Sequence, residues 1–347
     1  MTTFLYFALV LGVIVLIHEI GHLVTAKLFN VYCKEFAVGM GPKIFSKKFK
    51  ETEYSIRALP LGGFVAMAGE EGVDDNVPFE RSILGIAPWK RMIVMLAGIF
   101  MNFVLAFVLF VGIYAYQGYA VEAPKPIIAG TMVDSPAEKA GFMANDLIKK
   151  ITFSDGTTVI PTDFYEIITY IQMYTDTTEF VVDRNGTEIT ISVTPEFIEA
   201  ENRYYLGITM PNATRVEINA LGALKYGALE VGNTVESMVF TLTRLIRGIG
   251  LNAISGPIGI YQVTATQASY GLINILYLMG LLSINVAIFN LLPLPILDGG
   301  RVVLTLYELV FKKPMSKKVE QVLMVISIGM LLLLMAFVTL QDILRLI

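Results

Sequence analysis

Four long apolar runs stand out in the pattern of hydrophobic and polar positions along the chain. They cover about residues 4–29, 92–116, 271–297 and 319–340. A helix needs roughly 20 residues to cross a hydrocarbon core of about 30 Å, and each run is long enough. The pattern therefore predicts four transmembrane helices. We expect the first to be retained, because it lacks a basic start and is too long for a cleaved signal peptide.

The pattern between the second and third runs is that of a folded, water-exposed segment. Polar and apolar residues alternate over Glu188–Val193, as in a half-buried strand, and the preceding Asn185-Gly186 is a hairpin signal. Ser135-Pro136 and Gly141 carry the start and stop signals of a short helix. These patterns predict a small α+β domain with two short helices over about residues 123–211.

The same patterns divide the chain into four parts. They are an N-terminal membrane part (1–116), an extracytoplasmic domain (117–211), a connector (212–270) and a C-terminal membrane part (271–347). The connector contains an amphipathic stretch at about 220–250, which we expect on the outer surface.

Basic residues are distributed unevenly around the predicted spans. They gather after the first run and between the third and fourth, at Lys27, Lys34, Lys43, Lys47, Lys48, Lys50, Lys90, Arg91, Lys312, Lys313, Lys317 and Lys318. Residues 117–270 instead carry 10 basic and 17 acidic residues. Because lysine and arginine favour the cytoplasmic side, we expect both basic loops in the cytoplasm, and the N-terminus and residues 117–270 outside.

The composition agrees with a membrane protein and disfavours other classes. Of the 347 residues, 55% are hydrophobic and 16% charged, whereas about a quarter are charged in soluble domains. A cytosolic enzyme is therefore disfavoured, and the many aromatic residues disfavour a disordered chain. The net charge of −4 gives no reason to expect nucleic acid as a partner. The single cysteine, Cys33, cannot form an internal disulfide.

The first apolar run contains the motif His18-Glu19-Ile20-Gly21-His22. Histidines at i and i+4 lie on one face of a helix, where both can bind one zinc ion. The adjacent glutamate can take a proton from a zinc-bound water. Polar packing between helices is the alternative, but three ionisable groups inside a bilayer are costly without a function. The motif therefore predicts a hydrolytic zinc centre with Glu19 as its base.

A catalytic zinc ion takes three protein ligands and leaves one position for water. Since the chain has only two histidines, the third ligand must be a carboxylate or Cys33. Asp298 follows two prolines that break the third run near its cytoplasmic end, at a depth similar to that of His18. Asp298 is therefore our candidate, and a helix-capping aspartate is the alternative interpretation.

Together, these motifs resemble the site-2 protease family of intramembrane zinc proteases, and in particular its bacterial members of the RseP type. Further matches are Phe36–Pro42 and Pro60–Val65 after the first run, Ala97–Phe103 in the second run, and Ser255–Gly259 before the third. The chain departs from the family pattern at Gly98-Ile99, where members often have Gly-Pro.

The resemblance implies a membrane protein with about four transmembrane helices, a re-entrant β-loop and one extracytoplasmic PDZ-like α+β domain. It implies one Zn²⁺ ion per chain, with His18, His22 and Asp298 as ligands and Glu19 as the catalytic acid/base. The implied location is the bacterial plasma membrane, crossed several times, with the N-terminus and the PDZ-like domain outside.

The resemblance also implies residues that hold an extended substrate. Asn285 and Asn290 stand where family members have a substrate-binding asparagine, although asparagine can equally pack helices together. The segment with Gly39 and Gly41 resembles the re-entrant β-loop, whose backbone edges can pair with a substrate strand; a surface turn is the alternative.

The domain outside the membrane resembles a circularly permuted PDZ domain. The matching segments are Ser135–Ala137, Ala140–Phe142, Asn145–Ile148 and Tyr205–Ile208. The last of these resembles a carboxylate-binding loop, so that Leu206 and Gly207 would receive a peptide C-terminus through backbone N–H groups. The alternative is a domain that only filters substrates by size.

The implied activity is regulated intramembrane proteolysis of single-pass membrane proteins, such as anti-sigma factors or remnant signal peptides. Partners would be these substrates, C-terminal peptides at the PDZ-like domain and the lipid bilayer. Two alternatives remain open at this stage. One is the processing of a membrane-tethered pro-sigma factor, and the other is a non-catalytic PDZ scaffold.

Overall fold

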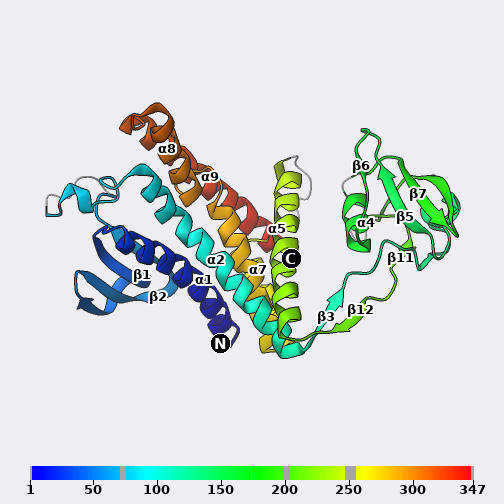
Figure 1. Cartoon of the computed structure of the whole chain (residues 1–347), viewed down its shortest axis with the longest axis horizontal. Helices are drawn as coiled ribbons and strands as arrows, with labels where there is room; N and C mark the ends of the chain where they lie inside the picture. The colour runs from blue at the N-terminus through cyan, green and yellow to red at the C-terminus, as the bar shows by residue number, and fades with distance from the viewer. Residues whose placement is uncertain (1, 71–75, 173, 199–202, 247–254, 345–347) are drawn as a thin grey trace. The chain divides into compact units, whose positions relative to one another are not determined.

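The structure is a computed structural model that describes residues 2–70, 76–172, 174–198, 203–246 and 255–344. Its residues form two compact units (Figure 1). The first unit contains the described residues up to Tyr116 and from Ala220 onward, and the second is Gln117–Asn219. The first unit holds the apolar runs and is called the membrane unit below. The second is called the outer unit because its residues lie outside those runs in the sequence.

The membrane unit consists mainly of helices. They are α1 (Thr2–Leu28), α2 (Pro88–Gln117), α5 (Ala220–Ile246), α6 (Pro257–Ser269), α7 (Leu272–Asn290), α8 (Asp298–Phe311) and α9 (Lys317–Leu344). Four of them, α1, α2, α7 and α9, are long and apolar enough to cross a membrane. The four predicted spans are thereby confirmed as helices. The predicted amphipathic stretch forms α5, and its last four residues, 247–250, lie outside the described residues.

The third apolar run is interrupted, as its prolines predict. Helix α7 ends at Asn290 and α8 begins at Asp298, with Pro293 and Pro295 between them. Proline lacks a backbone N–H and clashes with the preceding helical turn, so that the chain leaves the helix here. The intervening turn folds back onto α8 so closely that a Cβ atom at Gly299 would lie 2.2 Å from the carbonyl oxygen of Leu291. This turn fixes the position of the first residues of α8.

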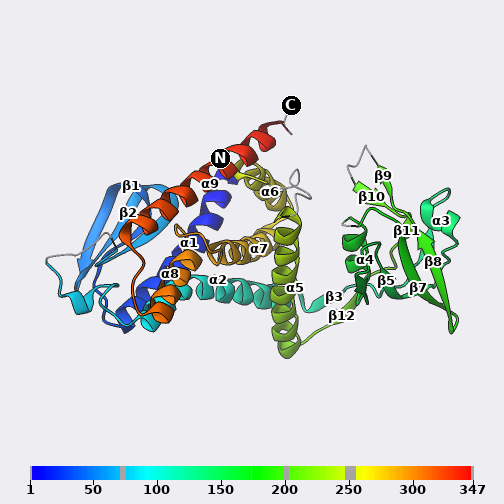
Figure 2. The ribbon, with the colours of Figure 1, turned by 90° about the horizontal axis from the view of Figure 1, so that it is seen from above.

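A long antiparallel hairpin lies beside α1 (Figures 1 and 2). Its strands are β1 (Cys33–Phe49) and β2 (Thr52–Met67), and they are followed by the 3-10 helix η1 (Phe79–Arg81). The backbone turns into the left-handed region at Gly39, where a Cβ atom would also lie 2.5 Å from the carbonyl oxygen of Leu59. Buried residues of α1, α2 and the hairpin share one apolar cluster that includes Leu23, Phe36 and Val94.

Two carboxylates connect helices of the membrane unit. Glu230 on α5 accepts hydrogen bonds from the hydroxyl groups of Tyr114 on α2, at 2.9 Å, and Tyr277 on α7, at 2.6 Å. Asp342 near the end of α9 is buried and accepts from the backbone N–H groups of Gly256 and Gly259 at the start of α6. These contacts attach α5 and α9 to the helices around the third span.

The outer unit is an α+β structure with two short helices. Its elements are β3 (Tyr119–Glu122), β4 (Gly130–Thr131), α3 (Pro136–Ala140), β5 (Leu147–Thr152), β6 (Thr158–Val159), α4 (Phe164–Ile171), β7 (Thr178–Arg184), β8 (Thr187–Val193), β9 (Glu196–Ile198), β10 (Arg203–Tyr205), β11 (Ile208–Thr209) and β12 (Thr214–Glu217). Four strands form an antiparallel sheet in the order β6-β5-β7-β8, and β3–β12, β4–β11 and β9–β10 form separate pairs.

Local signals in the sequence account for several of these elements. Ser135 accepts a hydrogen bond from the N–H of Glu138 and caps α3, which ends at Gly141 in the left-handed conformation. Asn185 and Gly186, both with positive φ, join β7 to β8 as predicted. The predicted domain 117–211 lies within the outer unit, which continues through β12 because that strand pairs with β3.

A buried ion pair joins two segments of the outer unit. The Asp146 side chain has no exposed surface, and it accepts hydrogen bonds from Arg184 to both oxygens at 2.7 Å and from the Met143 N–H at 2.8 Å. Burial alone raises the pKa of a carboxyl group, but these donors outweigh burial and hold the pKa of Asp146 below its ordinary value.

We expect Arg184→Met to lower the free energy of unfolding of the outer unit by about 3 kcal/mol, because it leaves a buried carboxylate unpaired. Amide hydrogen exchange within residues 128–193 of the full-length protein in detergent measures this change. The control is Lys149→Met, which removes an exposed pair with Asp183 at 3.8 Å and should change stability by less than about 0.5 kcal/mol.

The difference in free energy of unfolding between the wild type and Arg184→Met should also depend on pH. In the wild type, the lowered pKa of Asp146 means that its stabilisation is present above the ordinary carboxyl pKa of about 3.9 and is lost as pH falls through the folded-state value. In the variant, the unpaired carboxyl group takes up its proton at a higher pH and loses its unfavourable charge. The difference in free energy of unfolding should therefore become smaller as pH falls. A difference that grows would contradict this account.

Candidate metal centre

Helix α1 brings His18 and His22 together on one face. The two residues are one helical turn apart, and their Nε2 atoms lie 3.1 Å from each other. Both side chains are buried, with 8% and 6% of their surfaces exposed. Their two facing nitrogen atoms share a third polar partner.

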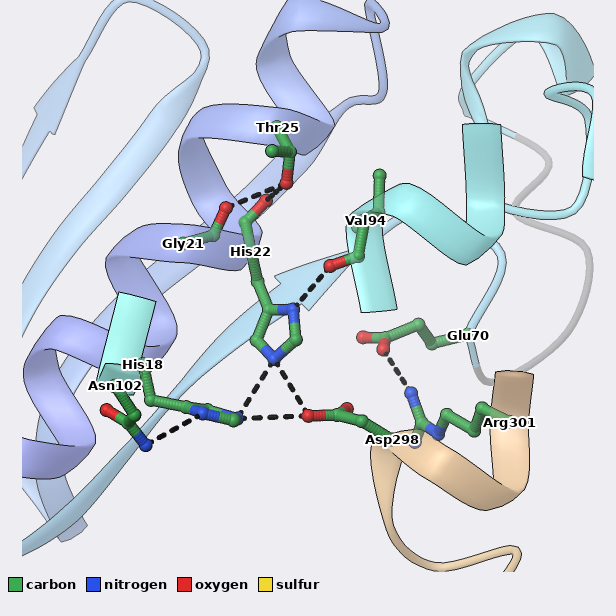
Figure 3. Close-up of polar contacts among 9 residues, drawn as sticks. All are labelled: His18, Gly21, His22, Thr25, Glu70, Val94, Asn102, Asp298 and Arg301. Atoms are coloured by element: carbon green, nitrogen blue, oxygen red, sulfur yellow. Dashed lines mark hydrogen bonds and ion pairs between the residues drawn. The ribbon is translucent and has the colours of Figure 1, made fainter. Parts of the chain in front are cut away.

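That partner is Asp298, the first residue of α8 (Figure 3). Its Oδ2 atom lies 3.0 Å from Nε2 of His18 and 3.3 Å from Nε2 of His22. The N-cap position of α8 is occupied by Leu297, and the carboxylate of Asp298 points toward the histidines. The broken third span thus delivers a carboxylate to the histidines of the first.

The three facing atoms fit a tetrahedral metal ion. Zinc holds nitrogen and oxygen ligands at about 2.0–2.2 Å, so that neighbouring ligand atoms of a tetrahedron lie about 3.3 Å apart. The observed separations of 3.0–3.3 Å match that spacing. Oδ2 of Asp298 is buried and has no hydrogen-bond donor. In the described part of the chain, no other three His, Cys, Asp or Glu side chains converge in this way.

Cys33, the other possible third ligand, is not part of this cluster. It is buried on β1, and its Sγ contacts the carbonyl oxygen of Val31 at 3.7 Å. Burial raises the pKa of its thiol to about 11, so the group is protonated and neutral at pH 7. A metal ligand would have to be the thiolate.

Helix α2 leaves room for an ion because it has glycine where it passes the histidines. A Cβ atom at Gly98 would lie 2.5 Å from Nε2 of His22 and 2.8 Å from Nε2 of His18. On α1, a Cβ atom at Gly21 would lie 2.4 Å from the carbonyl oxygen of Ala97, so the two helices are in backbone contact. Any side chain at position 98 would occupy the space in front of the imidazole nitrogens.

The second nitrogen of each imidazole contacts α2. Nδ1 of His22 lies 2.8 Å from the carbonyl oxygen of Val94 and donates its proton there, which leaves Nε2 with a lone pair facing the centre. Nδ1 of His18 lies 3.3 Å from the amide of Asn102. Val94 was not predicted, because a backbone carbonyl has no side-chain signature. The signals for Asn102 are a polar residue in an apolar run and its place in the matching segment Ala97–Phe103.

Glu19 lies beside the hairpin and close to the same cluster. Its carboxylate accepts a hydrogen bond from the backbone N–H of Val65 on β2 and interacts electrostatically with both histidines and Asp298. A Cβ atom at Gly63 would lie 3.7 Å from Cγ of Glu19, so the strand runs directly alongside it. The hairpin therefore fixes the position of the glutamate.

The remaining predicted residues of the membrane unit lie on two elements, α7 and β1. Asn285 is half-buried within α7, and Asn290 is the last residue of that helix. Gly39 and Gly41 lie on β1 with φ of 88° and 83°. Among the described residues, no hydrogen bond connects any of the four to the two histidines or Asp298.

Leu206 and Gly207 link β10 to β11 in the outer unit. Leu206 is 2% exposed and belongs to the core of that unit, and its carbonyl oxygen accepts from the N–H of Ala137 at 2.8 Å. Gly207 has φ of 80°, and its carbonyl oxygen accepts from the N–H of Met132 at 2.7 Å. The loop is therefore held in place by its carbonyl groups.

Residues 6–334 match the model of peptidase family M50. The chain belongs to this family. It is 30% identical to the zinc metalloprotease RasP of Bacillus licheniformis, in an alignment of 428 positions that covers 100% of both chains. It is 32% identical to the zinc metalloprotease RasP of Geobacillus kaustophilus, and the alignment covers 97% of this chain and 96% of that protein. It is 29% identical to the regulator of sigma-W protease RasP of Bacillus subtilis, with 99% of each chain covered.

The family membership confirms the resemblance seen in the motifs. The protein is an intramembrane zinc metalloprotease of the site-2 type, a multi-pass membrane protein whose cofactor is Zn²⁺. A solved PDZ domain of an SdrC-like protein from Listeria monocytogenes matches 26% of this chain and 92% of that domain at 22% identity, with a TM-score of 0.22. A score of that size does not establish a shared fold.

We expect Gly98→Ala to abolish zinc binding, because the added methyl group would occupy the space in front of both Nε2 atoms. Zinc content of the purified protein, measured by inductively coupled plasma mass spectrometry, tests this. Gly112→Ala is the matched control on the same helix, since nothing lies within 4 Å of a Cβ atom there. Equal zinc in both variants would show that the ion lies elsewhere.

Proposed function

We propose that His18, His22 and Asp298 hold the catalytic zinc ion and that Glu19 is the acid/base of peptide hydrolysis within the membrane. The observation that carries this proposal is the convergence of two imidazole nitrogens and one carboxylate oxygen within 3.0–3.3 Å. The glycine at position 98 adds to it, as does the buried Oδ2 of Asp298, which has no hydrogen-bond donor.

The chemistry divides between the ion and the chain. Zinc held at this position would polarise the scissile carbonyl group and lower the pKa of an attacking water. The Glu19 carboxylate takes the proton from that water and passes it to the nitrogen of the leaving amine. The Val65 N–H holds this carboxylate in place during both transfers.

The substrate is a single-pass transmembrane segment that unwinds near the centre. A helical peptide bond is protected by its own hydrogen bonds, so cleavage requires new partners for the exposed backbone. Within the described residues, the β1–β2 sheet has two strands, and each strand has one edge that no other described strand covers. We propose that the segment around Gly39 and Gly41 is a re-entrant loop that offers this edge, and that Asn285 and Asn290 add amide groups.

Exposed apolar side chains on the hairpin support the re-entrant placement. Met40, Ile44, Phe45 and Leu59 each expose more than half of their surface. In water such a patch would be unfavourable, whereas in the edge of a bilayer it is buried in lipid. The natural substrates in this proposal include anti-sigma factors and remnant signal peptides; that RasP of Bacillus subtilis is named a regulator of sigma-W protease supports the first class.

The outer unit is proposed to be an extracytoplasmic PDZ-like domain that receives peptide C-termini at Leu206 and Gly207. The ordered link between β10 and β11, with its left-handed glycine, supports a preformed binding loop. The proposed location is the bacterial plasma membrane with the N-terminus outside, and the proposed parts are residues 1–116, 117–211, 212–270 and 271–347. The charge difference between the two sides supports this orientation.

The ligand and base assignments predict different effects of two substitutions. Asp298→Ala should lose zinc, because two imidazoles alone do not hold it, and should therefore lose cleavage of a single-pass reporter substrate. Glu19→Gln should keep about one zinc per chain and lose cleavage by at least about 100-fold, as expected for removal of a general base. The control Cys33→Ser should keep both zinc and activity. Full activity of Glu19→Gln would overturn the mechanism.

The proposed orientation predicts which positions a membrane-impermeant maleimide can reach in intact cells. In a Cys33→Ala background, Asn185→Cys in the outer unit should be labelled from outside, and Lys313→Cys between α8 and α9 should be labelled only after the cells are opened. Both positions are exposed in the structure, so that access depends only on the side of the membrane. The reverse labelling pattern would contradict the orientation.

A further inference from the structure

Asn102 has a buried side-chain amide on an apolar helix, and only some of its hydrogen-bonding groups have partners. Its side chain has no exposed surface, its backbone carbonyl accepts from the Ser283 hydroxyl of α7 at 2.8 Å, and its side-chain Nδ2 faces Nδ1 of His18 at 3.3 Å. Its Oδ1 has no hydrogen-bond donor. A buried amide in such surroundings is costly unless it has a function.

The residues of α2 that face the histidines are evenly spaced along the helix. Val94, Gly98 and Asn102 follow each other at intervals of four, so they share one face of the helix. The Val94 carbonyl meets Nδ1 of His22, and the Asn102 amide meets Nδ1 of His18 (Figure 3). Gly98, between these two residues in the sequence, leaves space before both Nε2 atoms. This face of α2 is therefore complementary to the histidine pair of α1.

The chemistry of a metal ligand decides which end of the amide faces His18. A neutral imidazole that binds a metal through Nε2 carries its proton on Nδ1, and this proton needs an acceptor. The amide nitrogen of Asn102 is a donor only, whereas its oxygen is an acceptor. The two ends have the same shape, so a half-turn of the amide brings Oδ1 to Nδ1 without displacing any neighbour.

With Nδ2 facing His18, Oδ1 has no hydrogen-bond donor among the described residues, so turning the amide breaks no hydrogen bond at that end. The position of the proton on His18 then decides between the two orientations. With Oδ1 facing Nδ1–H, both histidines of the centre donate to oxygen atoms of α2. His22 donates to the backbone carbonyl of Val94, and His18 donates to the side-chain oxygen of Asn102.

We infer that Asn102 is a positioning residue that accepts the Nδ1–H of His18 and thereby sets the tautomer and the ring orientation of that zinc ligand. The inference rests on the proposed ligand set. Residues that orient a metal-bound histidine in this way contribute about 10–100-fold to metal affinity. Asn102 touches neither substrate nor ion, so its effect reaches the reaction only through His18.

The test compares zinc dissociation constants of the full-length protein in detergent, measured by competition with a chelator. Asn102→Leu keeps the approximate shape of the side chain but removes the acceptor, and should weaken zinc binding about 10–100-fold. Asn102→Asp restores an acceptor and should bind zinc within a few-fold of the wild type or more tightly. If Asn102→Leu does not fold, Asn102→Ala, which leaves space instead of filling it, provides the same comparison.

Ser283→Ala is the matched control. It removes the hydrogen bond to the carbonyl of the same residue and weakens the same contact between α2 and α7, but leaves the amide beside His18. Its zinc affinity should equal that of the wild type. Wild-type affinity of Asn102→Leu, or an Asn102→Asp variant as weak as Asn102→Leu, would overturn the inference.

His18→Ala separates this inference from the ligand assignment on which it rests. Loss of zinc in His18→Ala together with wild-type affinity in Asn102→Leu would refute the role of Asn102 alone. Full zinc binding by His18→Ala would instead refute the ligand set. The visible spectrum of the Co²⁺-loaded protein is a second readout, since a rotated His18 ring changes the ligand geometry, and a purely structural role of Asn102 would leave that spectrum unchanged.

Discussion

The meeting of two imidazole nitrogens with one carboxylate oxygen inside an apolar helix bundle is the constraint on which the rest of the membrane unit depends. Groups of this kind are costly in a bilayer, so each must be held against a partner. The histidines require α1 and α2 to touch through glycine backbone, and the carboxylate requires the third span to break before Asp298. The hairpin then fixes the remaining acidic group, Glu19, from the other side.

Much of this arrangement was predictable from sequence, because its strongest signals are local. Histidines at i and i+4 specify one helix face whatever surrounds them, and prolines at 293 and 295 break a helix wherever they occur. The start of α3 at Ser135-Pro136 and the turn at Asn185-Gly186 follow the same logic. The prediction of Asp298 is less direct, because it rests on the chemistry of zinc and the count of histidines.

The contacts that sequence did not predict are those between distant backbones. The Val94 carbonyl has no signature in the amino-acid pattern, and Gly98 looks like any packing glycine until its distance to the two imidazoles is known. The pairing of β3 with β12, which extends the outer unit to residue 219, likewise joins segments almost a hundred residues apart, and neither short strand has a strong pattern of its own. Tertiary placement, not local propensity, determines these features.

The order of the proposed ligands along the chain has a consequence for biosynthesis. His18 and Asp298 are separated by about 280 residues, and the turn that positions Asp298 lies after the outer unit and the third span. A chain still emerging from the ribosome holds its two histidines in the membrane long before the carboxylate exists. A newly inserted N-terminal half is therefore a protease without a complete centre, and hydrolytic competence arises only when the last membrane segments have been translated and docked.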